Sequence, residues 1–156
     1  MDKIDRKILN LLQQDATLAT ADIAAAVGLS STPCWRRIQR LQEKGVIRKR
    51  VALLSRDQLN LGVDVFVAVK SNHHNWEWLE EFSKTVSQFP EVVEFYRMAG
   101  ESDYLLRVVV PDIPAFDKFY KKLVQSSDLA DVSSSFAMEQ IKYTTALPLD
   151  YAVTDK

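Results

Sequence analysis

The order of apolar segments after residue 62 is the feature that most narrows the folds open to this chain. Alternating β-branched residues are typical of strands, whereas apolar residues three or four positions apart are typical of helices. The segments comprise a strand at 63–70, a helix with Trp78, Leu79, Phe82 and Val86 after a cap at Asn72 or Asn75, strands at 92–98 and 104–110, a helix after Asp112, and a strand at 132–143. This βαββαβ order predicts an α+β fold of the ferredoxin-like type, a four-stranded antiparallel sheet with both helices on one face.

The first predicted strand is apolar on both of its faces. The alternate valines of residues 63–69 point to one side, and Phe66 and Ala68 point to the other. Because the two helices cover one face only, the second face needs another cover, and a second copy of the same sheet is the simplest one. We therefore expect a two-fold homodimer.

Residues 1–45 have helical spacing and predict three short helices. Asp2 is the expected N-cap of the first helix, and Thr20 is the expected N-cap of the second, which ends at Gly28. The third begins with Thr32 as its N-cap and Pro33 after it, because the first turn of a helix does not need a proline N–H. A helix, a short helix, a glycine-containing turn and a basic helix together predict a helix-turn-helix.

The third helix has a buried stripe and a cationic face. Cys34, Ile38 and Leu41 form the stripe, and Trp35 lies only ~60° from Ile38 at helical spacing, which favours core packing over base contact. A short basic strand is predicted at 46–50. With this strand the N-terminal part reads as a winged helix-turn-helix.

The polar residues of this region have expected roles at double-stranded DNA. Arg36 and Arg40 point away from the stripe, so they are best placed for base edges, where a guanidinium binds guanine bidentately. Arg37 lies on the flank of the helix, where it is as well suited to a phosphate, or to a carboxylate of its own chain, as to a base edge. The expected DNA-binding residues are Ser31, Thr32, Arg36, Arg37, Gln39 and Arg40 on the helix, and Arg48 and Lys49, which meet phosphates.

Charge separates the chain into two parts. Residues 1–60 contain 11 Lys/Arg and 6 Asp/Glu, whereas residues 61–156 contain 9 Lys/Arg and 15 Asp/Glu. A basic patch on a chain of nearly neutral total charge is typical of a DNA-binding module joined to something else. We place the boundary near residue 60, with the DNA-binding domain and its linker at 1–60 and the second domain at 61–156.

Several other classes of protein are disfavoured. No apolar run approaches the ~20 residues of a membrane span and no signal region is evident, so a cytoplasmic protein without membrane contact is expected. The single cysteine, Cys34, lies on the buried stripe of the third helix, so a packing role is favoured over a redox role. His73 and His74 lack a set of metal ligands, and no nucleophile or phosphate-binding loop is evident, so we expect neither an enzyme nor a metal site nor a resident cofactor.

Four motifs follow one another along the chain: LSSTPCWRRIQRL, GVI, MAGESDYLLRV and SSSFAMEQIKYTTALPL. In order and spacing they resemble the Lrp/AsnC (feast/famine) regulators, most closely the members that respond to cysteine, leucine or methionine. The resemblance implies a regulator of amino-acid metabolism. It also implies that the C-terminal (RAM) domain forms dimers that associate into tetramers or octamers.

The resemblance further implies a small amino acid as effector, bound between dimers, with cysteine, leucine and methionine as candidates. The effector residues carried over from the family are Gly100, Glu101, Ser102, Asp103, Ser135, Phe136 and Ala137. Turn N–H groups can hold a carboxylate and Asp103 can hold an ammonium group, whereas the alternative is a plain hairpin turn. Ala99 and Ser102 stand where the family usually has threonine and an aromatic residue, which leaves the ligand and the response open.

Two other functions remain as alternatives. The chain could be an amino-acid-sensing adaptor whose N-terminal domain binds a protein, or a regulator that has lost effector binding. The salt dependence of DNA binding distinguishes the adaptor from a regulator. A regulator loses affinity for DNA steeply as salt rises, whereas an adaptor binds DNA weakly and with little dependence on salt.

Overall fold

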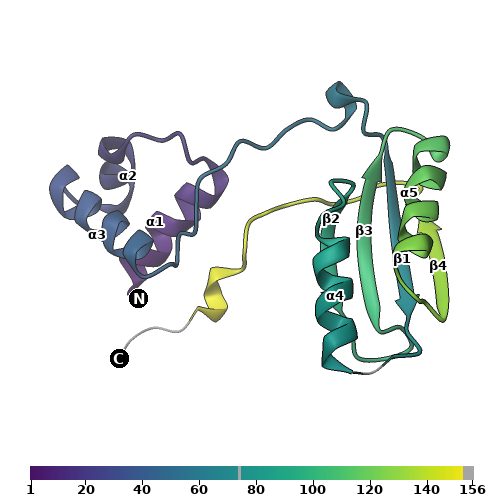
Figure 1. Ribbon diagram of the computed structural model, residues 1–156. Coiled ribbons are helices and arrows are strands. Elements are labelled where there is room, and N and C mark those ends of the chain that lie inside the picture. Colours follow the sequence, from purple (N-terminus) through teal and green to yellow (C-terminus); the bar gives the residue numbers. More distant parts are fainter. Residues whose placement is uncertain (74, 153–156) are drawn as a thin grey trace. The chain divides into compact units, whose positions relative to one another are not determined.

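The computed structural model describes residues 1–73 and 75–152 of the 156-residue chain. Contacts divide it into two units, one formed by Met1–Leu53 with the chain from Lys142 onward, the other by Leu54–Ile141 (Figure 1). The sequence placed a boundary near residue 60 and assigned all of 61–156 to the second domain. By contacts, the linker from Leu54 belongs with the sheet, and the chain after Ile141 belongs with the N-terminal helices.

Three helices build the first unit: α1 (Lys3–Gln14), α2 (Thr20–Val27) and α3 (Ser31–Glu43). Their shared core is made by the buried residues Ile8, Leu12, Ile23, Ala24, Val27, Cys34 and Ile38. Asp2 caps α1 as predicted, since its side chain accepts a hydrogen bond from the Asp5 N–H at 2.8 Å. Gly28 ends α2 with φ 75°, a left-handed conformation that favours glycine.

Two of these helices begin at other residues than the sequence predicted. Ser30 is the N-cap of α3, so Thr32 lies inside the helix and Pro33 is its third residue. Pro33 fits there because the N–H groups of the first turn have no acceptor within the helix. Ala19 is the N-cap of α2, and Thr20 is the first helical residue.

The strand predicted at 46–50 is wrong, because the described backbone has no strand in this stretch. The N–H groups of Val46 and Ile47 both donate to the Leu41 carbonyl, at 3.0 and 3.1 Å, and Gly45 turns the chain with φ 70°. These groups complete the end of α3 instead of pairing with a strand. The basic segment 48–50 continues from there as irregular chain.

The second unit is, as predicted, a four-stranded antiparallel sheet with two helices, and its strand order is β2-β3-β1-β4. The elements are β1 (Val63–Lys70), α4 (Trp76–Val86), β2 (Val92–Arg97), β3 (Tyr104–Val110), α5 (Ile113–Ser126) and β4 (Asp131–Phe136), preceded by the short η1 (Asp57–Leu59). Asn75 and Asp112 cap the two helices, accepting from the Trp78 and Ala115 N–H groups at 2.8 and 2.7 Å. Residue 74 lies outside the described residues.

One face of this sheet forms the core of the unit. Val65, Val67 and Val69 of β1 are fully buried there, in register with residues of β3 and against Phe82 of α4 and Phe119 of α5. Phe66 is on the other face and is 40% exposed. The two-sided apolar character that the sequence predicted for β1 is therefore present, and α4 and α5 bury one side only.

The last strand ends at Phe136, so the prediction that it extends to residue 143 is wrong. β4 pairs with β1, and Phe136 lies opposite Val65, near the start of β1. The Ala137 N–H still donates to the Asp64 carbonyl at 3.0 Å, after which β1 offers no further partner. The length of β4 is therefore set by where its neighbour begins.

The chain beyond the sheet returns to α1 before η2 (Leu149–Tyr151). Gln13 of α1 makes two hydrogen bonds to the backbone of Leu147: its Oε1 accepts from the N–H at 2.9 Å and its Nε2 donates to the carbonyl at 3.1 Å. A single side chain thus satisfies both backbone groups of one tail residue. Within the described residues, no helix combines the length and apolar character needed to cross a membrane.

The buried face of the sheet gives a test of the fold. Leu106 lies in the central strand β3 and is fully buried, so Leu106→Ala should lower the free energy of unfolding of the sheet unit by about 2–5 kcal/mol. Urea denaturation followed by circular dichroism measures the change. Val124→Ala, at a position 43% exposed, is the control and should change stability by less than about 1 kcal/mol. Equal effects of the two substitutions would contradict the assigned core.

Candidate nucleic-acid interface and effector region

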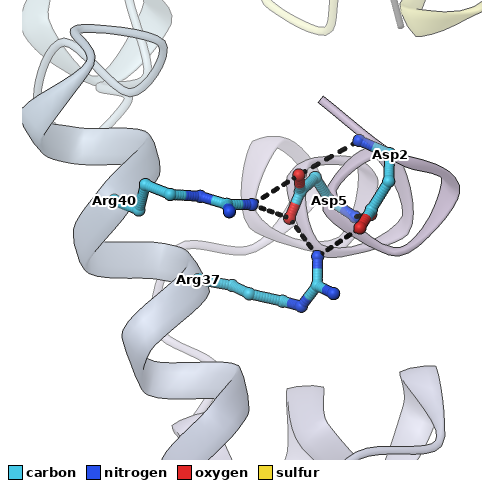
Figure 2. A network of polar contacts seen from close by, with 4 residues as sticks. All are labelled: Asp2, Asp5, Arg37 and Arg40. Carbon is cyan, nitrogen blue, oxygen red and sulfur yellow. Dashed lines mark hydrogen bonds and ion pairs between the residues drawn. The ribbon is translucent and has the colours of Figure 1, made fainter. Parts of the chain in front are cut away.

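The carboxylate of Asp5 lies at the junction of α1 and α3 and is 1% exposed. Arg37 donates to its Oδ1 at 2.8 Å, and Arg40 donates to its Oδ2 at 3.0 Å and to its Oδ1 at 3.3 Å (Figure 2). The Asp2 N–H donates to the Oδ2 atom at 3.1 Å. We call these four residues the Asp5 cluster.

The Asp5 cluster joins the start of α1 to the middle of α3. Arg37 also pairs with the Asp2 carboxylate at 2.6 Å. The pKa of Asp2 is held below its usual value by the Asp5 N–H and then by the Arg37 guanidinium. Removing one partner from a buried charge is costly, so the cluster fixes how α3 lies against α1.

The DNA-binding residues expected from the sequence fall into two groups. Ser31, Thr32 and Arg36 are exposed on α3, Gln39 is half-buried, and Arg48 and Lys49 are exposed after the helix. Arg37 and Arg40 instead reach across to the Asp5 carboxylate on α1. The carboxylate pairing considered for Arg37 is present. Arg40 was expected to point away from the core without a partner, but it pairs with Asp5, which lies 35 residues earlier in the chain.

Trp35 is 53% exposed, so its predicted core packing is wrong. The stripe of Cys34, Ile38 and Leu41 is buried as predicted, and it fills the space against α1 and α2 without the indole ring.

Cys34 is fully buried, and burial raises the pKa of its thiol, an effect that the nearby Arg37 charge opposes. A buried, protonated thiol packs as a small apolar side chain. Across residues 1–73 and 75–152, no group of three or more His, Cys, Asp or Glu side chains is arranged to hold a metal ion.

The turn expected to hold an effector lies between β2 and β3. Gly100 has φ 146°, and the Met98 N–H donates to the Asp103 carbonyl at 2.8 Å. The Asp103 carboxylate accepts from the Ser71 N–H at 2.8 Å, and the Asp103 N–H donates to the Val69 carbonyl at 3.0 Å. Asp103 therefore joins this turn to the end of β1 rather than bonding to its own backbone.

The other expected effector residues, Ser135, Phe136 and Ala137, lie elsewhere on the sheet. Phe136 pairs with Val65, whereas Tyr104, directly after Asp103, pairs with Val69. These positions are four residues apart along β1, about 13 Å at the rise of a strand. One chain thus presents the expected effector residues in two separate groups and does not bring them together.

Sequence reasoning missed a charged network on the helix-free face of the sheet. Asp64 of β1 is 7% exposed and pairs with Arg56 of the linker and with Arg107 of β3, the latter at 3.2 Å. Arg107 also donates to Glu94 at 2.8 Å, and the hydrogen bond from Tyr96 to Glu94 raises the tyrosine pKa. Single charges within the apolar runs VDVFVAV and YLLRVVV were the available signal, because a charge buried within a strand needs a partner.

Two family models cover most of the chain. Residues 1–48 match a winged helix-turn-helix DNA-binding model, and residues 64–147 match the Lrp/AsnC ligand binding domain. A helix-turn-helix unit joined to a ligand-binding sheet defines a DNA-binding transcriptional regulator with a ligand domain. The chain belongs to the Lrp/AsnC family of these regulators.

Relatives match over nearly the whole length. The DNA-binding transcriptional activator DecR of Escherichia coli (strain K12) is 54% identical over 151 residues, which cover 96% of this chain and 99% of DecR. The glutamate uptake regulatory protein of Zymomonas mobilis is 48% identical over 149 residues, covering 96% and 91% of the two chains. The names of both relatives describe regulation.

Solved structures agree with this fold. An AsnC family transcriptional regulator from Agrobacterium tumefaciens superposes with a TM-score of 0.96 at 63% identity, covering 98% of this chain and 100% of that one. A transcriptional regulator from Neisseria meningitidis, solved as an L-Met complex, has a TM-score of 0.93 at 36% identity and covers 98% and 99%.

Loss of the central carboxylate should loosen the helix unit. Asp5→Ala removes the acceptor of two guanidinium groups and one N–H, so we expect a loss of about 1–3 kcal/mol in the free energy of unfolding of this unit. Chemical denaturation with amide hydrogen exchange in α1 and α3 measures it. Asp22→Ala, an exposed first-turn aspartate of α2, is the matched control. Unchanged exchange in Asp5→Ala would show that the cluster contributes nothing.

Proposed function

We propose that this regulator is a cytoplasmic homodimer, assembling further into tetramers or octamers, whose affinity for double-stranded DNA is changed by a small amino acid. The observation that carries the proposal is the separation of the two groups of effector residues. A ligand that needs both the turn at 100–103 and the strand end at 135–137 requires the turn of one chain and the strand end of another.

The helix-free face of the sheet supports the dimer. Phe66 and Tyr96 are 40% and 50% exposed on it, around the paired charges of Asp64 and Arg107. A second sheet placed on this face covers the apolar side chains and leaves the charges with the partners they already have. Two chains then present two copies of α3 for two half-sites.

The amino-acid class of the effector is supported by the ligand-binding domain, and methionine, leucine and cysteine are the candidates. Methionine is the first to test, because the related Neisseria regulator was solved with L-Met. The ligand acts by population shift: it binds more tightly to one assembly than to another and so favours one spacing of the two α3 helices. Asp103 and the turn N–H groups are suited to the ammonium and carboxylate groups of a free amino acid.

DNA binding should depend steeply on salt. The exposed residues Arg48, Lys49 and Arg50 give three phosphate contacts in each chain and six in a dimer, so affinity for a preferred duplex should fall about 10³-fold between 50 and 200 mM salt. Fluorescence anisotropy with a duplex selected by the full chain measures it. A nearly flat response would favour the adaptor that binds a protein partner.

The effector role of Asp103 can be separated from its role in the turn. Asp103→Asn keeps an oxygen that accepts from the Ser71 N–H but removes the charge that would hold an ammonium group. We expect wild type to be stabilised by about 2.7 kcal/mol at an amino-acid concentration 100 times its Kd, with DNA affinity shifting in parallel. The variant should keep its fold and DNA binding and lose this response, whereas Asp117→Asn on α5 should keep it.

If none of the twenty amino acids stabilises the wild type, the regulator has lost amino-acid sensing. If Asp103→Asn responds like the wild type, Asp103 serves only to hold the turn.

A further inference from the structure

The helix α3 has one exposed large apolar side chain, that of Trp35, 53% of which is open to solvent. The buried stripe of Cys34, Ile38 and Leu41 is complete without it. Among the ring contacts of the described residues, none involves Trp35. The indole is therefore about half open to solvent and stacks on no other ring of the described residues.

The position of Trp35 on α3 is opposite to the tied arginines. At about 100° per residue, Arg37 and Arg40 lie on the flank that faces α1, where the Asp5 cluster holds them. Trp35 lies on the other flank, and Arg36, exposed and without a salt bridge in the described chain, lies between the two. The sector from Trp35 to Arg36 also holds Thr32 and Gln39, so it is the part of α3 open to a partner.

The chemistry of this sector matches two groups on neighbouring bases in the major groove. A guanidinium with no carboxylate partner can bind O6 and N7 of guanine, and a large apolar ring can cover the C5-methyl group of thymine, the apolar group that the major groove displays. The indole has enough flat surface to remove that methyl group from water. Neither contact requires Arg37 or Arg40 to leave Asp5.

We propose that Trp35 is a specificity-determining residue that recognises a thymine methyl group beside a guanine bound by Arg36. This inference rests on the proposed DNA-binding function and adds to it which residues read the sequence. The Asp5 cluster keeps Arg37 and Arg40 in structural roles, so the sequence preference is set by the flank of α3 that carries Trp35.

Replacement of thymine by uracil tests the proposal, because it removes only the methyl group. A preferred duplex is first selected from a random pool with the full chain, and each thymine is then replaced in turn. Wild type should lose affinity about fourfold at one thymine of each half-site, the effect of one buried methyl-sized group. Replacing the adjacent guanine by 7-deazaguanine should weaken binding in the same way, and Arg36→Ala should cost about 5- to 150-fold.

The variant Trp35→Ala should bind more weakly and show no difference between thymine and uracil at that position, while its other base preferences persist. Trp35→Phe, which keeps an apolar ring, should retain the difference. Trp76→Ala is the matched control, since Trp76 is 71% exposed on α4 of the sheet unit, and it should behave like wild type. Thermal unfolding checks that each variant is folded.

The outcomes separate the two levels of the proposal. If wild type tolerates uracil at every position, or if Trp35→Ala keeps the same thymine preference, the role of Trp35 is overturned and sequence-specific DNA binding stands. If wild type enriches no sequence at all, the proposed regulatory function is overturned together with the role of Trp35.

Discussion

A buried carboxylate needs cations and hydrogen-bond donors around it, and the helix unit is built around one such group, that of Asp5. Asp5 receives two guanidinium groups and a backbone N–H, and with Asp2 it balances the charges of Arg37 and Arg40. The arrangement fixes the rotation of α3, because these arginines reach Asp5 from only one flank of the helix. The same requirement decides which side of α3 stays free of contacts with α1. A cation count from the sequence therefore overstates the charge that the helix offers.

Much of the fold could be predicted because its signals are local. Caps at Asp2, Asn75 and Asp112 lie within three residues of the N–H groups that they accept from, and the strand pattern of 63–70 is visible within a single segment. Two errors have different origins: one depends on a segment far away in the sequence, and the other on a hydrogen-bond acceptor five or six residues back. The end of β4 is set by the start of β1, and the N–H groups of Val46 and Ile47 are taken up by the Leu41 carbonyl.

The candidate site was harder to predict than the fold because its charged partners lie far apart in the sequence. Helical spacing correctly placed Arg36 outward, but the partner of Arg40 lies 35 residues away in α1. Trp35 was assigned to the core from its angle on the helix alone, although Cys34, Ile38 and Leu41 already form the buried side of α3. The Asp64–Arg107 pair joins β1 to β3 across 43 residues, so periodicity could locate each charge but not its partner.

The tail that returns to α1 has a consequence for how the chain is made. The hydrogen bonds between Gln13 and Leu147 join residues separated by 134 positions, with the complete sheet between them in the sequence. The ribosome adds Leu147 to the growing chain only after every strand and helix of the sheet unit has been synthesised. The N-terminal helices therefore gain their last contacts only when the sheet has already been translated. Nascent polypeptides that stop before the tail lack this part of the DNA-binding unit.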